Sequence, residues 1–148
     1  MQNRHIDRQK YFDELATTTR KYILPYIASY IRFESQLRVL ELGCGDGGNL
    51  LPFAEQGCSV VGVDLCECRI NTAKQNFKDT SSDFRFYVPD ICNLLDDEYG
   101  CFDIIICHDV IEHIERKSVV LESISRMLVK DELCNFVSTT CFYILAHE

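Results

Sequence analysis

The fold of this chain is decided by the stretch Val39-Leu40-Glu41-Leu42-Gly43-Cys44-Gly45-Asp46-Gly47-Gly48-Asn49-Leu50. Strand-like residues run into a turn that is dense in glycine, and a helix-like segment follows. Glycine adopts backbone angles that other residues avoid, so this turn lets a ligand approach the backbone closely. The N-terminal amides of the helix would face the same space. The stretch therefore predicts a nucleotide-like ligand at a strand-to-helix turn.

The spacing of the glycines leaves two cofactors open. Gly43, Gly45 and Gly48 fit the dinucleotide pattern G-x-G-x-x-G. Asp64 follows roughly 20 residues later, at the end of a second predicted strand, where its carboxylate could hold ribose hydroxyls. Both features suit NAD and S-adenosylmethionine equally well.

Glu41 separates these two cofactors by its charge. It lies two residues before Gly43, so its carboxylate should border the loop. Two like charges about 4 Å apart cost about 4 kcal/mol at an effective dielectric constant of about 20, and a pyrophosphate would meet that repulsion. S-adenosylmethionine carries an ammonium and a sulfonium, which the same carboxylate attracts. Glu41 therefore favours the methyl donor.

The segment Glu41-Leu42-Gly43-Cys44-Gly45-Asp46-Gly47 resembles the acidic-x-G-x-G-x-G motif of class I S-adenosylmethionine-dependent methyltransferases. The form Leu-Glu-Leu-Gly-Cys-Gly is similar to the small-molecule, quinone-biosynthesis-like group, methyltransferase types 11 and 12. The resemblance covers about residues 36–140. It implies S-adenosyl-L-methionine as the cofactor and places Glu41, Gly43, Cys44 and Gly45 in its binding site.

Strand-like and helix-like segments alternate along the chain, which predicts an α/β fold with a Rossmann-like, doubly wound and mostly parallel sheet. We expect one domain over residues 1–148, with an N-terminal helical cap at 1–35 and the Rossmann-like core at 36–140. The predicted strands are about five, at residues 37–42, 58–64, 83–88, 102–107 and 133–140, and the predicted helices lie at 6–32, 48–56, around Ile70, Ala73 and Phe77, and at 117–129.

The first helix carries an apolar stripe and a predicted break. The stripe recurs at helical spacing, and Pro25 should kink or split the helix near Leu24. In related methyltransferases a helix at this position partly covers the cofactor pocket, so the resemblance implies that Tyr11 and Tyr22 contribute to it; a plain packing helix is the alternative. The stripe consists of Phe12, Leu15, Thr19, Ile23 and Ile27.

The C-terminal end departs from the family pattern. Members of the family continue past the fifth strand into a final antiparallel pair, whereas this chain stops at Glu148. We therefore expect a C-terminally short domain without the usual hairpin, which is either a truncated product or one whose exposed sheet edge pairs with a second copy in a homodimer. A non-catalytic remnant of the cofactor fold is a further alternative.

The composition of the chain indicates which partners and which cellular compartment to expect. A net charge of −8 argues against nucleic acid as a partner, and no apolar run approaches 18 residues, so no membrane span is expected. The nine cysteines form no C-x-x-C pair, and a reducing cytoplasm fits them best. Cys66-Glu67-Cys68 could be a metal or redox pair, but a helix starting there should splay the two side chains.

Further cofactor contacts follow two predicted strands. Asp64 can accept from both ribose hydroxyls, or cap the next helix, and Leu65 would lie against adenine. By resemblance, Asp90 would accept from the adenine amine while Ile91 covers the ring. His108 follows the fourth strand and would border the methionine part, largely through its backbone.

Glu112-His113 resembles the Glu-His pair of quinone-type methyltransferases and provides the candidate catalytic residues. Methyl transfer needs in-line positioning and, for a hydroxyl acceptor, removal of a proton. An imidazole with a pKa near about 6.5 suits that task, so His113 is the predicted base, with local pairing to Glu112 as the alternative. Asp109, Glu112 and His113 also resemble a metal-holding set, but Glu stands in those enzymes where this chain has Asp109, and we predict no metal.

The sequence thus predicts S-adenosylmethionine-dependent methylation of an oxygen or carbon atom of a small-molecule acceptor. An NAD-linked oxidoreductase is the alternative from another class, and Glu41 disfavours it.

Overall fold

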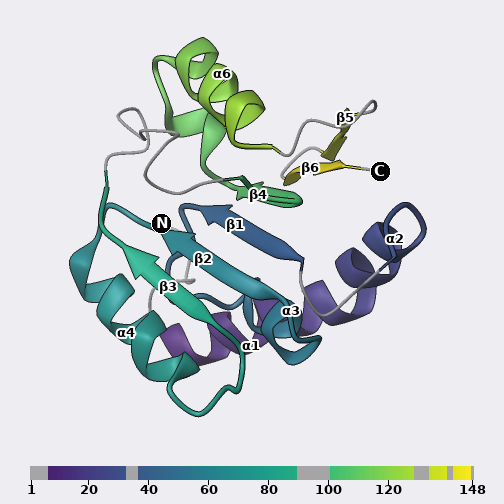
Figure 1. The fold of residues 1–148 in the computed structure, drawn as a ribbon. Coiled ribbons are helices and arrows are strands. Elements are labelled where there is room, and N and C mark those ends of the chain that lie inside the picture. Colours follow the sequence, from purple (N-terminus) through teal and green to yellow (C-terminus); the bar gives the residue numbers. More distant parts are fainter. Residues whose placement is uncertain (1–6, 33–36, 90–100, 129–133, 140–141, 148) are drawn as a thin grey trace.

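The computed structural model describes residues 7–32, 37–89, 101–128, 134–139 and 142–147, the last two ranges as backbone alone. Runs of aliphatic residues form three parallel neighbours at the centre of a sheet, β1 (Arg38–Leu42), β2 (Ser59–Val63) and β4 (Ile104–His108). The shorter β3 (Phe84–Tyr87) pairs in parallel with β2 at one edge. The predicted α/β, Rossmann-like fold is confirmed (Figure 1).

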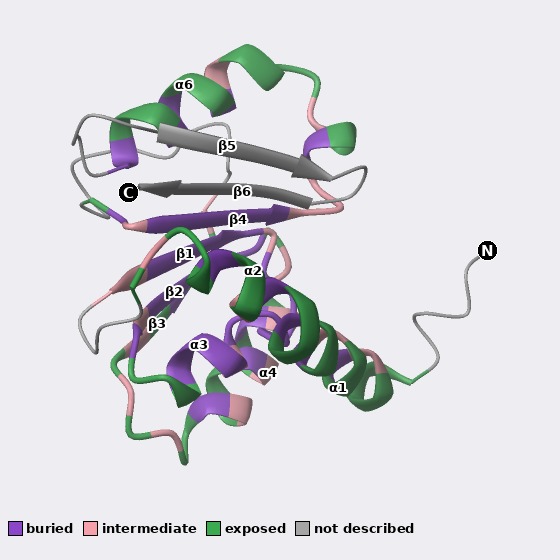
Figure 2. Cartoon of the chain, turned by 90° about the vertical axis from the view of Figure 1, so that its right-hand side faces the viewer, coloured by how far each residue is buried: buried purple, intermediate pink, exposed green. Residues whose placement is uncertain are grey.

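Both faces of the central strands β1, β2 and β4 are buried, because alternate residues of each strand pack into different layers. In β1, Val39 belongs to the layer under α3 (Leu51–Glu55) and α4 (Glu67–Phe77), and Leu40 belongs to the layer under α6 (Lys117–Met127). Figure 1 shows α3 and α4 below the sheet and α6 above it, and Figure 2 shows the central strands as buried. The sheet is therefore doubly wound, as predicted.

The predicted N-terminal helix is present but interrupted. It consists of α1 (Arg8–Thr18), capped by the Asp7 side chain, a π-helical segment η2 (Thr19–Ile23) and α2 (Leu24–Ala28). Pro25 has no N–H to donate, and the regular hydrogen-bond ladder gives way to the wider π-helical turn just before it. The predicted stripe is buried except at Leu15, which is half-buried.

Two element boundaries differ from the prediction. The helix expected at 48–56 is the shorter α3, because residues 43–50 form turns of the glycine loop instead. Val88, expected inside the third strand, follows the end of β3 and is 48% exposed. The strand stops one residue earlier because Pro89 lacks the N–H that a sheet ladder needs.

The prediction that the C-terminal antiparallel pair is absent is wrong. The fifth strand, β5 (Cys134–Thr139), pairs antiparallel with a sixth strand, β6 (Phe142–His147), and β6 pairs antiparallel with β4. Two residues separate β5 from β6, which is enough for a hairpin but far too few for a parallel crossover. The sheet order is β3-β2-β1-β4-β6-β5, so β6 covers the edge of β4, and a homodimer through the outer edge stays a prediction.

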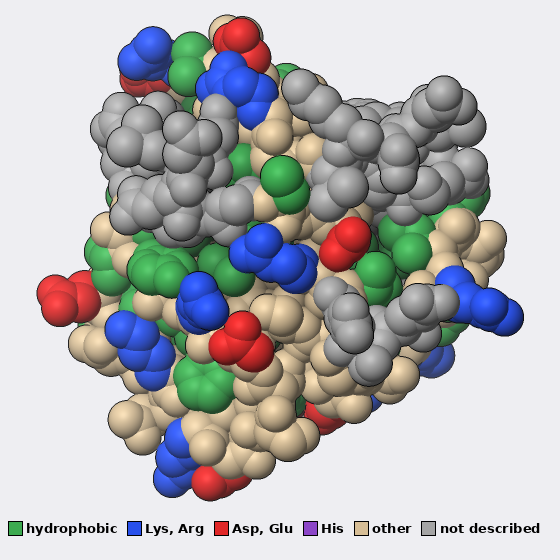
Figure 3. All heavy atoms as spheres, viewed as in Figure 1, with side chains coloured by type: hydrophobic (Ala, Val, Ile, Leu, Met, Phe, Trp, Pro, Cys, Tyr) green, Lys and Arg blue, Asp and Glu red, His purple; other side chains and the backbone are tan. Residues whose placement is uncertain are grey.

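The sheet topology reverses beside β1. The chain runs outward from β1 through β2 to β3 and then returns to place β4 on the other side of β1. Open α/β sheets bind ligands at the carboxyl ends of the strands on either side of such a reversal. Among the described helices, none is long and apolar enough to cross a membrane. The face in Figure 3 carries Lys and Arg side chains interspersed with Asp and Glu.

Candidate functional site

A cavity of about 610 Å³ lies at the carboxyl ends of β1, β2 and β4, where the topology predicts a ligand. This volume falls within the range of small-molecule sites. Its walls come from α1, the glycine loop, the β2–α4 turn and the segment after β4. The lining residues are Tyr11, Leu15, Glu41, Gly43, Cys44, Asn49, Asp64, Leu65, Arg69, His108, Asp109, Val110, His113, Ile114, Glu115 and Arg116.

The glycine loop bends through backbone angles that favour glycine. Gly43 and Gly45 have φ values of +71° and +54°. A Cβ at Gly43 would lie 2.2 Å from the Val110 side chain, so no larger residue fits there. Gly48 serves packing instead, because a Cβ there would lie 2.8 Å from the backbone oxygen of Phe12 in α1. The loop thus approaches both the cavity and the N-terminal helix closely.

The helix after the loop does not offer free amides, contrary to the prediction for its N-terminus. The amides of Leu50 and Leu51 donate to the Gly47 carbonyl, and those of Phe53 and Ala54 donate to the Leu50 carbonyl. Pro52 has no amide hydrogen. A phosphate would find few donors at this helix end, which disfavours a dinucleotide.

Glu41 lies on the cavity wall and is only 1% exposed. Its Oε1 accepts a hydrogen bond of 2.7 Å from Asn49 Nδ2, whereas Oε2 has no partner among the described residues. Burial raises the pKa of Glu41 to about 8, the Asn49 hydrogen bond opposes that shift, and the Asp64 carboxylate adds to it. An unpartnered buried carboxylate oxygen is costly unless a ligand supplies a donor or a cation.

Asn49 organises this part of the site, and the sequence reading did not identify it. Besides donating to Glu41, its Nδ2 lies 3.3 Å from Nδ1 of His108. Its Oδ1 accepts a hydrogen bond of 3.0 Å from the Thr19 hydroxyl in the π-helical segment. Asn49 is 1% exposed, and no local pattern in the sequence marks it as a partner of Glu41.

Asp64 and Leu65 stand where the sequence predicts them, at the end of β2. Asp64 Oδ2 accepts from the Gly45 amide and Oδ1 accepts from the Cys66 amide, both at 2.9 Å. Each oxygen keeps a second lone pair for a further hydroxyl donor. Leu65 is 67% exposed and lines the cavity, so an apolar ligand surface would find a ready partner there.

The segment after β4 contributes a strained turn. Asp109 has a φ of +51°, which non-glycine residues rarely adopt, and it is the one such residue in the described ranges. His108 Nε2 lies 3.5 Å from Asp109 Oδ2. The side chain of His108 therefore contacts Asn49 and Asp109, while the backbone contact with the methionine part stays a prediction.

Of the two predicted catalytic residues, His113 lines the cavity and Glu112 does not. His113 ends the 3-10 turn η4 (Ile111–His113), is exposed and lines the cavity. Glu112 is exposed as well, but it is not among the lining residues. Within the described ranges, no group of three or more His, Cys, Asp or Glu side chains is placed to hold a metal ion. The predicted residues Asp90 and Ile91 lie outside the described residues.

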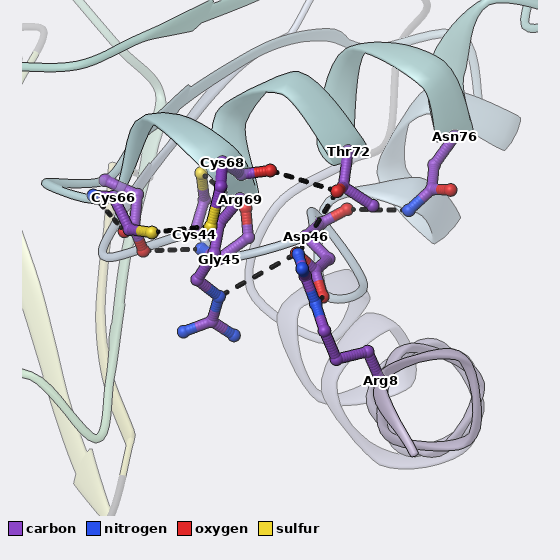
Figure 4. Close-up of polar contacts among 10 residues, drawn as sticks. Arg8, Cys44, Gly45, Asp46, Cys66, Cys68, Arg69, Thr72 and Asn76 are labelled. Carbon is purple, nitrogen blue, oxygen red and sulfur yellow. Dashed lines mark hydrogen bonds and ion pairs between the residues drawn. The ribbon is translucent and has the colours of Figure 1, made fainter. Parts of the chain in front are cut away.

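The N-terminal helix is tied to the glycine loop. Arg8 of α1 forms a two-pronged ion pair with the buried carboxylate of Asp46, and Arg69 of α4 lies 3.8 Å from the same carboxylate (Figure 4). Tyr11, in the same helix, lines the cavity, as predicted. The expectation for Tyr22 is wrong: it is 60% exposed and lies outside the cavity, beyond the first helical turns that reach it.

Arg69 is a second lining residue that the sequence reading did not identify. Its guanidinium lies next to Gly45, where a Cβ would be 2.5 Å from Nη2. No local signal marks it, since an arginine in the first turns of a helix is ordinary. Cys44, by contrast, was predicted, and its thiol packs into the core beside Gly62, so it borders the cavity mainly with its backbone.

Comparison with known proteins shows the family of this chain. A family model described as a methyltransferase domain matches residues 39–131. The ubiquinone biosynthesis O-methyltransferase of Rickettsia felis is 34% identical over 95 residues, 64% of this chain and 38% of that protein. The enzyme of the same name from Bartonella quintana is 36% identical over 113 residues, 75% of this chain and 44% of that protein. The chain spans about two fifths of the length of these relatives.

Solved structures share the same architecture. The structure of PKMT2 from Rickettsia typhi in complex with AdoHcy matches with a TM-score of 0.59 at 33% identity, over 64% of this chain and 19% of that chain. The magnesium protoporphyrin IX methyltransferase of Synechocystis with bound SAM matches with a TM-score of 0.65 at 19% identity, over 98% of this chain and 84% of that chain. The second likeness shows the fold alone.

Proposed function

The chain belongs to the methyltransferase domain family, the class I S-adenosylmethionine-dependent enzymes, and from that premise we propose that its cavity binds S-adenosylmethionine and methylates a small-molecule hydroxyl. One observation carries the proposal: Glu41 lines a cavity at the reversal of the sheet, and its buried Oε2 has no hydrogen-bond partner among the described residues. A cationic ligand would give that oxygen the partner it lacks.

The residues of the cavity fit this ligand. Glu41 would pair with the positive charge of the methionine part, and the backbone of residues 43–45 would let it approach. Asp64 would accept the ribose hydroxyls on its remaining lone pairs, and the exposed Leu65 would cover an adenine face. We propose that residues 1–148 act here as one unit, with the N-terminal helices as a cap, because Tyr11 and Leu15 line the same cavity.

For methyl transfer to a hydroxyl, the protein must position the acceptor and remove one proton from it. The bound sulfonium supplies an activated methyl group and a good leaving group. The cavity would orient the acceptor, and His113, on the exposed rim, would take the proton of the acceptor hydroxyl at an imidazole nitrogen. Glu112, adjacent in sequence, would contribute through its charge. The relatives' name, ubiquinone biosynthesis O-methyltransferase, supports an oxygen acceptor.

Two titrations test the donor assignment. Calorimetric titration with S-adenosylmethionine should show saturable binding, whereas NADH at millimolar concentration should show none. Binding of NADH alone would overturn the assignment in favour of an oxidoreductase. The absence of binding for both ligands would leave a remnant that keeps only the fold.

Transfer is tested with a labelled methyl group and catechol as the acceptor probe. His113→Gln should lower the turnover rate by about a hundredfold, the usual contribution of a general base, and leave donor affinity unchanged. Glu115→Gln, on the same rim, is the matched control and should keep most of the turnover. Equal losses in both variants would show that His113 holds the rim together and does not take the proton.

A further inference from the structure

Two thiols face each other beside the cavity. The sulfur atoms of Cys66 and Cys68 lie 2.9 Å apart, only about 1 Å more than in a disulfide bond. Figure 4 shows the two side chains side by side, joined by a dashed line. The expectation that a helix would splay them is wrong. Cys66 is the N-cap of α4, with an extended backbone, so its side chain does not follow the helical spiral that would separate residues two apart.

The surroundings make this pair reactive. Cys66 is half-buried and Cys68 is exposed, so small oxidants can reach both. The pKa of Cys66 is lowered, first by the hydrogen bond from the Cys68 thiol and then by the Arg69 backbone amide at the start of the helix. Burial instead raises the pKa of Cys58 to about 11 and that of Cys107 to about 12. Oxidation by a thiolate route therefore favours the exposed pair.

We propose that Cys66 and Cys68 form a peroxide-sensitive dithiol that closes to a disulfide and thereby weakens donor binding. The Cys66 thiolate attacks one oxygen of a hydroperoxide, which breaks the O–O bond and gives a sulfenic acid and one water or alcohol. The Cys68 sulfur then attacks the sulfenic sulfur, the S–S bond forms and a water leaves. The two thiols lose two electrons and two protons, and the peroxide is reduced.

The link to the cavity runs through Asp64. The Cys66 amide donates to Asp64 Oδ1 at 2.9 Å, and Leu65 lies between these two residues. Closing the S–S bond would draw residues 66 and 68 together, and a displacement of the Cys66 amide with them would weaken its hydrogen bond to the carboxylate proposed to hold the ribose. This consequence rests on the proposed function, whereas the formation of the disulfide does not.

The experiment treats the reduced protein with one equivalent of hydrogen peroxide and follows two readouts. Mass spectrometry of peptides should show the loss of two hydrogen atoms from the segment that holds Cys66 and Cys68, reversed by dithiothreitol. Calorimetry should show S-adenosylmethionine binding about tenfold weaker after oxidation, the effect of losing one hydrogen bond to a charged group. Cys68→Ser should bind the donor normally and lose the reversible response, and Cys101→Ser, at another exposed thiol, should keep it.

Each outcome decides one part of the proposal. Intact thiols at Cys66 and Cys68, while other cysteines oxidise, would overturn the dithiol. A disulfide that leaves donor affinity unchanged, or a response retained by Cys68→Ser, would overturn its control of binding. Absence of donor binding in the reduced protein would count against the proposed function, and the mass measurement would still test the dithiol.

Discussion

The cavity has two sides that are built differently. One side is a wall formed by Glu41, Asn49 and Asp64 and proposed to hold the donor. This wall is buried, and hydrogen bonds of 2.7–2.9 Å fix its side chains, while Glu41 Oε2 has no partner among the described residues. The rim, residues 109–116, contains exposed side chains on a short strained turn. Buried polar groups need hydrogen-bond partners, so the side chains of the wall are held in one arrangement before the ligand binds. The exposed side chains of the rim are under no such constraint and can adapt to the acceptor. Substitutions should therefore act on donor affinity at the wall and on turnover at the rim.

The largest expected effect comes from the charge of the wall. Glu41→Gln keeps the shape and the Asn49 hydrogen bond but removes the anion. S-adenosylmethionine affinity measured by calorimetry should fall about a hundredfold, the value of a charge-assisted contact. His113→Gln on the rim is the control and should leave this affinity unchanged. Equal donor affinities for Glu41→Gln and the original chain would break the distinction between wall and rim.

The same substitution should have the opposite effect on stability. The folded pKa of Glu41, about 8, lies above its ordinary value, so its contribution to stability is complete below the ordinary pKa and is lost as pH rises through about 8. Without donor, Glu41→Gln should therefore melt several degrees higher than the original chain at pH 8.5 and nearly equally at pH 5. A lower melting temperature at pH 8.5 would contradict the raised pKa.

The next effect is a pH dependence of donor binding. Below pH 8 the buried Glu41 is protonated without ligand, and a cationic donor prefers the carboxylate, so binding releases a proton. Donor affinity should rise by about tenfold per pH unit from pH 6 and level off near pH 8. Calorimetry in buffers of different ionisation enthalpy measures the number of protons released on donor binding. Glu41→Gln should give a profile without this rise.

A smaller effect is expected from Asn49. Its hydrogen bond lowers the pKa of Glu41, so Asn49→Ala should move the midpoint of the binding pH profile upward. Donor affinity at pH 7 should fall by about tenfold. Thr19→Val is the matched control, because it removes only the bond on the far side of the Asn49 amide. Equal losses in both variants would assign the effect to packing of the helix.

The smallest effect distinguishes two ion pairs of the N-terminal helices. Arg8 pairs with Asp46 beside the cavity. Arg20 forms a 2.6 Å ion pair with Glu55, and neither of these two residues lines the cavity. Arg20 and Glu55 are both exposed, so Arg20→Gln should cost no more than about 1 kcal/mol in urea unfolding. Arg8→Gln should cost more, because it leaves the buried Asp46 carboxylate with only the longer contact to Arg69. Only Arg8→Gln should also weaken donor binding, by a few-fold, because it loosens the helix that carries Tyr11. A similar loss of donor affinity in Arg20→Gln would show that any ion pair of the N-terminal helices, and not Arg8–Asp46 in particular, supports donor binding.

The difference between wall and rim also explains what the sequence could predict. The wall lies beside β-branched strands and a glycine loop, whose periodicity and backbone needs are local, so Glu41 and Asp64 could be placed at the site from their positions alone. His113 was placed by resemblance. Asn49 and Arg69 were missed because an amide and a guanidinium carry no local pattern that says what they will face.

By itself, the sequence determined the alternating strands and helices, the turn at Gly43 and Gly45, and the acidic residues at the strand ends, because each depends on neighbouring residues. Only the tertiary structure decided that Asn49 holds Glu41, that Arg8 reaches Asp46, that Cys66 meets Cys68 and that β6 pairs with β4. These contacts depend on how helix caps and distant segments pack together. The local sequence around each of these residues does not predict such contacts.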